Sequence, residues 1–364
     1  MKGHPDFTVA MVIPTGVGAS QGGYGGDATV WMNLLASVCD TLVTHPNVAN
    51  AAAFQALPSN ALYVEGYGLD AFFKGDWGFR PVLAQRLGVI VDAGLEAGMK
   101  TLHYNVINAV QATYGVPLVA VAESTEPLDL TLSLTEAGIS VGEWLNPQAV
   151  LSVAKGLIET HGITALALVT RLEEPPESVY KSGVGVDPIG GLEAILSHTL
   201  VEALGIPVAN APCFDWEEAQ PRRDELVHPF TASEYTTASF LPCVLRGLHH
   251  APDFVPLHRH DAYIHAYAKL LTVHDLNAVV LPYDCMGGVP FLSALERGIP
   301  VIAVKSNQTV LALTAEALLG REAVERLVAR GLYFEATSYD EAVGILQRLK
   351  LGLSAPDALG VSKV

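Results

Sequence analysis

The stretch GVGASQGGYGGDATVWMNLLAS at residues 16–37 and the stretch GVGVDPIGGLEAILSH at residues 183–198 decide the fold. The first follows an apolar string and predicts a strand at 8–14, a glycine-rich loop at 16–27 and a helix at 28–39. The second predicts the same order. Glycine-rich loops that open helices commonly expose backbone N–H groups to an anion. The candidate ligand-binding glycines of the two loops are Gly16, Gly18, Gly22, Gly23, Gly183, Gly185, Gly190 and Gly191.

Four other apolar strings lack the alternation of strands that face water on one side. They are LGVIVDA at 87–93, ALALVTRL at 165–172, AVVLP at 278–282 and IPVIAV at 299–304. Such strings are typical of parallel strands that are covered on both faces. The predicted fold is α/β, with two pseudo-repeated lobes that are each a mainly parallel sheet flanked by helices.

The two halves of the chain repeat the order of glycine loop, helix, apolar string, helix and apolar string. This order is consistent with an internal duplication, although any chain of βαβ units produces similar matches. A polar stretch at 123–148 indicates the boundary. We expect lobes at 1–145 and 146–364, with an excursion at 213–275. Because ligands bind at the carboxyl ends of parallel strands, we expect the site in the cleft between the halves.

The composition limits the classes of partner. There are 38 acidic and 21 basic residues, the formal net charge is -17, and Lys and Arg form no run, so neither nucleic acid nor a membrane surface is expected as a partner. Mean hydropathy is +0.33, yet no apolar run approaches the roughly 18 residues of a membrane span. The four cysteines have no CxxC spacing, and the N-terminal apolar stretch is short for a signal sequence. We expect a cytoplasmic protein with reduced thiols, and its assembly into a homo-oligomer is left open.

Asp284 and Cys285 follow an apolar string immediately before an expected helix. A helix N-terminus lowers the pKa of a thiol, so Cys285 is the candidate nucleophile. An inert small residue in a tight loop is the alternative. Cys213, facing Cys285 across the cleft, would suit proton exchange at a carbon acid, as in a racemase.

Asp187 lies in the second glycine loop, where a carboxylate can point into a cleft. We favour it as a catalytic residue over Glu193, which fits an ordinary acid in a first helical turn. His45 fits either a general base or a buried structural histidine. The repeated sequence VANA favours a ligand-binding role for Asn50 and Asn210.

The tract HHAPDFVPLHRH at 249–260 places His258 and His260 on one face if it forms a strand. Both are weak candidates as metal ligands, because such tracts are more often solvated excursions. The loop at 16–23 matches neither the Rossmann nor the Walker pattern. No cofactor is therefore predicted.

The stretch GGVPFLSALERGIPVIAV at 287–304 resembles the donor-binding segment of two-lobed glycosyltransferases, in which a Gly-Gly helix start holds a diphosphate. This resemblance makes Gly287 and Gly288 candidate ligand residues. Lys305, directly after the stretch, is a candidate cation. A glycosyltransferase-like or nucleotide-sugar-binding protein is thus one alternative function.

The whole chain resembles an uncharacterised family that carries a domain of unknown function and occurs in cyanobacteria, other bacteria and plants. The matching stretches are IPTGVGASQGGYGGDA, THPNVANAA, LYVEGYGLD, GVDPIGGLEAILSH and FLPCVLRGL. The resemblance implies no activity and no catalytic residues.

These observations predict a small-molecule metabolic enzyme, either a hydrolase or an isomerase, that acts on a small anionic metabolite between the glycine loops. Cys285, Asp284, Asp187 and His45 would carry the chemistry. Lys305 and loop N–H groups would offset the negative charge of the chain around the anion. A non-catalytic ligand sensor or scaffold is the other alternative, because a fold does not fix a function.

Overall fold

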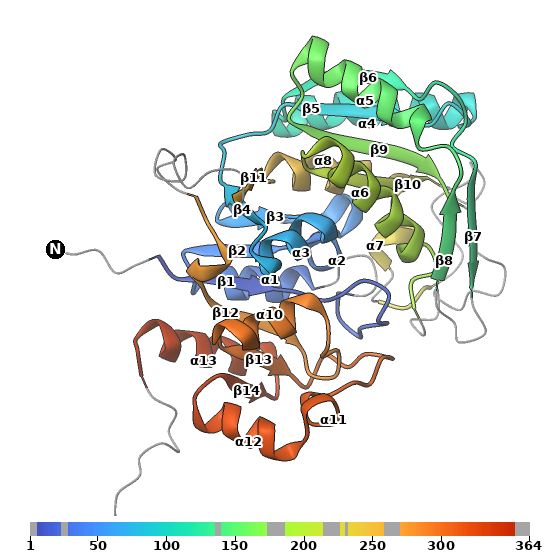
Figure 1. The fold of residues 1–364 in the computed structure, drawn as a ribbon. Coiled ribbons are helices and arrows are strands. Elements are labelled where there is room, and N and C mark those ends of the chain that lie inside the picture. The colour runs from blue at the N-terminus through green and yellow to red at the C-terminus, as the bar shows by residue number, and fades with distance from the viewer. Residues whose placement is uncertain are drawn as a thin grey trace, which may run out of the picture.

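The structure is a computed structural model that describes residues 6–22, 28–134, 140–172, 186–213, 226–229, 232–257 and 270–353. Figure 1 shows its two parallel sheets and the helices around them. The larger, six-stranded sheet has the order β14-β13-β12-β1-β2-β3. Its strands are β1 (Thr8–Met11), β2 (Thr41–Thr44), β3 (Ala61–Tyr63), β12 (Leu276–Pro282), β13 (Val301–Val304) and β14 (Tyr333–Ala336).

The four-stranded sheet has the order β10-β9-β5-β6 and is also parallel. Its strands are β5 (Leu87–Val91), β6 (Leu118–Glu123), β9 (Ala165–Arg171) and β10 (Val208–Cys213). Every residue of β5 and β10 is buried, as the unalternated strings predict for strands that are covered on both faces. The α/β class with parallel sheets flanked by helices is confirmed.

Helices cover both faces of each sheet. On the six-stranded sheet, α1 (Thr29–Ala36) and α13 (Tyr339–Lys350) pack on one face, and α3 (Gly66–Lys74) and α10 (Val289–Arg297) pack on the other. On the four-stranded sheet, α4 (Ala97–Tyr114) and α8 (Leu241–His249) cover one face, and α5 (Gln148–His161) and α6 (Gly190–Leu204) cover the other. The shorter helices are α2 (Pro46–Ala49), η1 (Ala52–Phe54), α7 (Ala232–Tyr235), η4 (Val273–Asp275), α11 (Ala315–Leu319) and α12 (Arg321–Ala329).

Two antiparallel strand pairs complete the fold. β4 (Trp77–Arg80) pairs with β11 (Asp253–Pro256), and these strands bracket the segment that contains the whole four-stranded sheet. β7 (Leu130–Leu134) and β8 (Ser140–Trp144) form a hairpin beside the carboxyl ends of β9 and β10 (Figure 1). Among the described helices, none combines the length and the apolar character that a membrane span requires.

The boundary expected at residue 145 does not separate the sheets. The six-stranded sheet joins β1, β2 and β3 to β12, β13 and β14, and the four-stranded sheet joins β5 and β6 to β9 and β10. One apolar core runs from α1 and α13 to α4 and α8, so it links the two sheets.

Each sheet contains a point at which its connections diverge. From β9 the chain crosses over α6 to β10, and from its neighbour β5 it crosses over α4, on the opposite face, to β6. The neighbours β1 and β12 diverge in the same way through α1 and α10. Crevices at the carboxyl ends of such diverging strands are the usual ligand sites of open α/β sheets.

Candidate functional site

Loops from the two sheets meet beside the start of α6. A Cβ atom added to Gly190, the first residue of α6, would lie 2.9 Å from Cγ2 of Thr15, in the loop after β1. The same loop is tied to the loop after β13, because Ser20 N donates to Gln308 O at 2.8 Å and Val310 N donates to Val17 O at 2.9 Å. The loop after β1 therefore lies against both the loop after β13 and the start of α6.

A cluster of three carboxyl groups, which we call the carboxyl cluster, lies at this junction and consists of Glu65, Asp187 and Glu193. Glu193 Oε1 accepts a hydrogen bond from Asn210 Nδ2 at 3.1 Å, and Thr170 Oγ1 donates to Asn210 Oδ1 at 2.9 Å. Thr170 and Asn210 come from the adjacent strands β9 and β10 and are buried. The sheet thus fixes the amide that orients Glu193.

Glu65 reaches the same place from the other sheet. It lies two residues after β3 and directly precedes α3, and its carboxyl group lies beside the side chain of Ser197 of α6, whose hydroxyl donates to Glu193 O at 2.8 Å. Because α3 packs against α6, Glu65 lies near Glu193, although the two residues belong to different sheets. Both residues are partly exposed as whole residues, while their carboxyl groups are buried.

The surroundings favour the protonated form of these two carboxyl groups. Burial raises the pKa of Glu65 to about 8. Burial, together with the negative charge of Asp187, raises the pKa of Glu193 well above its usual range, although the bond from Asn210 opposes the shift. Shifts of this kind, caused by desolvation and by neighbouring charge, are typical of catalytic acids.

The sequence prediction placed Asp187, Gly190, Gly191 and Asn210 at a shared site, and the structure brings these residues to the same junction. Asp187 Oδ1 accepts from Ile189 N at 3.0 Å, which fixes the turn before α6. Asn50 contacts the carboxyl cluster only indirectly. Its Oδ1 accepts from the hydroxyl of the buried Tyr63 at 3.0 Å, and Tyr63 lies near Glu65 and Glu193.

His45 holds the backbone of the first loop. Its Nε2 accepts from Ile13 N at 3.0 Å, and it is 5% exposed. Burial lowers the pKa of His45 to about 4. The accepting nitrogen is occupied, so His45 has the surroundings of a structural histidine rather than those of a general base.

Cys285 does not have the surroundings expected of a nucleophile. Its side chain is 3% exposed, and burial together with the charge of Asp284 raises the pKa of its thiol to about 12. The expectation of an exposed thiol with a lowered pKa is therefore wrong, because apolar packing and an adjacent carboxylate outweigh the start of α10. Asp284 itself fastens the loop after β13, since its Oδ1 accepts from Thr309 N at 2.8 Å. Cys213, at the end of β10, is also buried.

The other candidates have mainly structural surroundings. Lys305 forms an ion pair of 2.6 Å with Glu335, which compensates its charge. Gly22 lies against Ile13, where an added Cβ would be 2.5 Å from Ile13 Cδ1. Positive φ angles explain the glycines at Gly16, Gly18 and Gly287, and Gly288 precedes the first residue of α10. Gly23, Gly183, Gly185, His258 and His260 lie outside the described residues.

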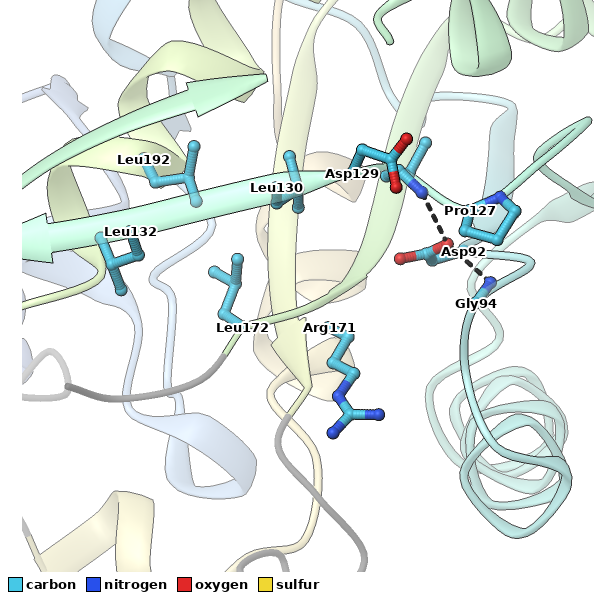
Figure 2. Close-up of a pocket in the computed structure, with 10 residues that line it drawn as sticks. Asp92, Gly94, Pro127, Asp129, Leu130, Leu132, Arg171, Leu172 and Leu192 are labelled. Carbon is cyan, nitrogen blue, oxygen red and sulfur yellow. Dashed lines mark hydrogen bonds between the residues drawn. The ribbon is translucent and has the colours of Figure 1, made fainter. Parts of the chain in front are cut away.

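A second feature is a cavity of about 350 Å³ beside the β7–β8 hairpin (Figure 2). It lies at the carboxyl ends of β5 and β9, where the connections of the four-stranded sheet diverge. Asp92 follows β5 at its edge, and its Oδ1 accepts from Gly94 N at 2.8 Å and Leu128 N at 3.3 Å. Within the described part of the chain, no three His, Cys, Asp or Glu side chains are arranged to hold a metal ion.

Sequence reasoning missed Glu65 and ranked Glu193 too low. Glu65 stands in LYVEGYGLD, where Asp70, five residues later, is the other acid and no histidine occurs. Its pKa depends on α6, whose contacts with α3 bridge a large separation in sequence. The spacing of Glu193 from Asp187 was the one signal in the sequence that could have raised its rank.

Comparisons with known proteins agree with the expected resemblance. Residues 8–359 match the family model described as "Protein of unknown function (DUF3326)". The chain is 36% identical, over 359 residues, to an uncharacterised lipoprotein of the cyanobacterium Synechococcus sp., covering 97% of this chain and 93% of that protein. No solved structure matches the chain. The chain therefore belongs to the DUF3326 family.

Proposed function

We propose that this chain is an enzyme that transfers protons on a small anionic molecule, in a hydrolysis or an isomerisation, at the carboxyl cluster. The observation that carries the proposal is the fixed and buried carboxyl group of Glu193, which Asn210 and Thr170 orient. A carboxyl group that is held in place and protonated at neutral pH is suited to donate a proton in a transition state.

Asp187 and Glu193 form an acid–base pair in this proposal. The negative charge of Asp187 raises the pKa of Glu193, so we assign the proton to Glu193 and the role of base to Asp187. Pairs of carboxyl groups whose surroundings separate their pKa values divide the acid and base roles in this way. Glu65, with a pKa of about 8, is a second proton donor.

An anionic substrate fits the protonated state of the cluster. Among the described residues, the charged groups that act on Glu193 are the acids Asp187, Glu65 and Glu234. An anion would therefore be repelled unless Glu65 and Glu193 carry protons and donate hydrogen bonds, together with N–H groups at the start of α6. Its affinity should fall as the pH rises through about 8, and that of a cationic substrate should rise.

The test begins with native mass spectrometry of the purified protein to identify any molecule that it retains, followed by an assay of its conversion. We expect Glu193→Gln to lower kcat by about 10² to 10⁴, because this is the usual contribution of a general acid. Glu202→Gln is the matched control, since it removes one exposed carboxylate from the same helix. Equal effects of the two variants, or full activity of both Glu193→Gln and Asp187→Asn, would contradict the proposal.

The arrangement of the sheets supports an internal duplication, which we also propose. In the two halves of the chain, β1 corresponds to β9, β2 to β10, β5 to β12 and β6 to β13. With this correspondence, the order β2-β1-β12-β13 in one sheet matches the order β10-β9-β5-β6 in the other. Asp92 follows β5, and Asp284 follows the equivalent strand β12. Asp92 accepts from Leu128 N, five residues after the end of β6, and Asp284 accepts from Thr309 N, five residues after the end of β13. Failure of the two sheets to superpose in an experimental structure would remove this support.

We keep the cytoplasm as the proposed location. Attachment to a membrane is the alternative, because the Synechococcus relative is named an uncharacterised lipoprotein. Fractionation of the native host decides between them, because recovery in the washed membrane fraction would contradict a cytoplasmic protein.

A further inference from the structure

The cavity beside the β7–β8 hairpin has the position and size of a small-molecule site. Its volume of about 350 Å³ lies at the lower end of the range of ligand pockets. It opens at the carboxyl ends of β5 and β9, from which the chain crosses to opposite faces of the sheet. This is the place where open α/β sheets ordinarily bind ligands. It is separate from the carboxyl cluster, although Leu192, which lines it, adjoins Glu193 on α6.

One end of the cavity is apolar and rigid. Figure 2 shows leucine side chains gathered there from β7, from the end of β9 and from α6. They are Leu130, Leu132, Leu172 and Leu192. Leu172 and Leu192 are fully or almost fully buried, so this wall is part of the core and does not need to form when a ligand arrives.

The other end is negatively charged. Asp92 and Asp129 lie side by side there, because Leu128 N binds Asp92 and Asp129 is the next residue (Figure 2). Asp92 is 4% exposed, and three backbone N–H groups, those of Gly94, Leu128 and Arg171, hold its carboxyl group. The Asp129 side chain is exposed and leaves its carboxylate open to a ligand.

Arg171 does not reverse this charge. Its guanidinium points away from the leucines, and its Nη1 lies 3.9 Å from Oε1 of Glu96 (Figure 2). The mouth therefore carries the carboxylates of Asp92 and Asp129 and the single guanidinium of Arg171, whose charge is already partly compensated by Glu96. The net charge of -17 on the whole chain acts in the same direction and favours cations over anions.

We propose that this cavity binds a primary ammonium group carried on a compact apolar body, with the ammonium at Asp92 and Asp129 and the apolar body against the four leucines. Hydrogen bonds to a charged group and burial of apolar surface would each contribute to the affinity. The same chemistry is found in a free aromatic or branched amine and in an amino acid or peptide N-terminus with an apolar side chain.

The test compares three probes of one shape by isothermal titration calorimetry: phenethylamine, 3-phenylpropionate and L-phenylalanine. We expect phenethylamine to bind at least about tenfold more tightly than 3-phenylpropionate, because the two probes differ in the sign of one charge. If L-phenylalanine binds more tightly than phenethylamine, the ligand is a free amino acid. If it binds more weakly, the ligand carries no carboxylate beside its ammonium group, as in a free amine or a peptide N-terminus.

Asp129→Asn should weaken the binding of phenethylamine by about tenfold, because it removes the open carboxylate and keeps the shape of the residue. Glu143→Gln is the matched control: it removes one exposed carboxylate from the same hairpin, at a residue that does not line the cavity, and should leave the affinity nearly unchanged. Thermal unfolding of both variants checks that the hairpin is intact.

Three results would each overturn the proposal: 3-phenylpropionate binding as tightly as phenethylamine, equal effects of Asp129→Asn and Glu143→Gln, or no heat of binding with phenethylamine at about 10 mM, a concentration that corresponds to negligible affinity. None of these measurements involves turnover. Their failure would leave the proposal for the carboxyl cluster untouched.

Discussion

His45 illustrates how one buried hydrogen bond determines the role of a titratable residue. Its neutral ring accepts from Ile13 N, and its pKa of about 4 lies below the ordinary value of 6.5 because charging the ring costs desolvation. Between pH 6.5 and about 4, the unfolded chain binds a proton that the folded protein does not. The contribution of His45 to stability is therefore present above pH 6.5 and is lost as the pH falls toward 4.

We predict that His45→Gln, which keeps an acceptor but does not titrate, flattens this loss. Between pH 7 and pH 5 the native protein should lose about 2 kcal/mol of unfolding free energy relative to the variant. His45→Ala should cost about 1–3 kcal/mol at pH 7, since it leaves the N–H of Ile13 unsatisfied. Urea unfolding at both pH values measures these differences, and parallel pH dependence of the native protein and His45→Gln would show that His45 is not protected from protonation.

The roles of single residues were only partly predictable from the sequence. Asp187 stands in the second glycine loop and Asn210 in the repeated VANA, and the structure places both at the junction. Cys285 was misjudged because the sequence shows a helix start but not the apolar packing that buries the thiol. Burial and charge at one side chain depend on segments that are far away in the sequence, which no local pattern contains.

At the scale of elements, the contact between the loop after β1 and the start of α6 makes a prediction. A Cβ at position 190 would lie 2.9 Å from Cγ2 of Thr15, closer than such atoms approach, so one of the two elements must shift. We expect Gly190→Ala to cost about 1–3 kcal/mol, as overpacking usually does, even though alanine favours the helix.

Thr15→Ser removes Cγ2 and tests the cause. The double variant Thr15→Ser with Gly190→Ala should regain most of the lost stability, so a double-mutant cycle measured by urea unfolding should give a coupling of about 1 kcal/mol or more. Additive effects of the two substitutions would mean that the loop and the helix do not touch.

The pattern of apolar residues and the positions of glycines predicted most of the helices and strands. The helix expected at 28–39 is α1 (Thr29–Ala36), and the helix after the second loop ends at Leu204. The repeated VANA misled the alignment of the halves, because at Asn210 it lies within β10, whereas Val48 and Ala49 belong to α2 and Asn50 follows them. Pro46 begins that helix, which explains why the same letters fold differently.

At the scale of the whole molecule, the order of the strands was beyond the reach of the sequence. Thr8 of β1 pairs with Leu276 of β12, and such distant pairing leaves no local trace in either strand. Local patterns predicted βαβ units correctly but could not assign them to a sheet. The sequence predicts two successive lobes with one sheet each. In the structure, the four-stranded sheet is instead formed by one continuous segment, residues 81–252, which lies between β4 and β11 in the chain.

This arrangement predicts how the chain can be divided. A cut at residue 145 removes β12, β13 and β14 from β1 and separates β5 from β9, so fragments 1–145 and 146–364 each carry incomplete sheets. Fragment 81–252 keeps the four-stranded sheet with α4, α5, α6 and α8 on its faces and loses only the part of the core shared with the six-stranded sheet. We expect 81–252 to unfold cooperatively in urea, at a lower midpoint than the whole protein, while 1–145 and 146–364 show no cooperative transition until they are mixed. Cooperative unfolding of 146–364 on its own would contradict this prediction, because that fragment keeps the β9–β10 pair without its neighbour β5 and the strands β12, β13 and β14 without their neighbour β1.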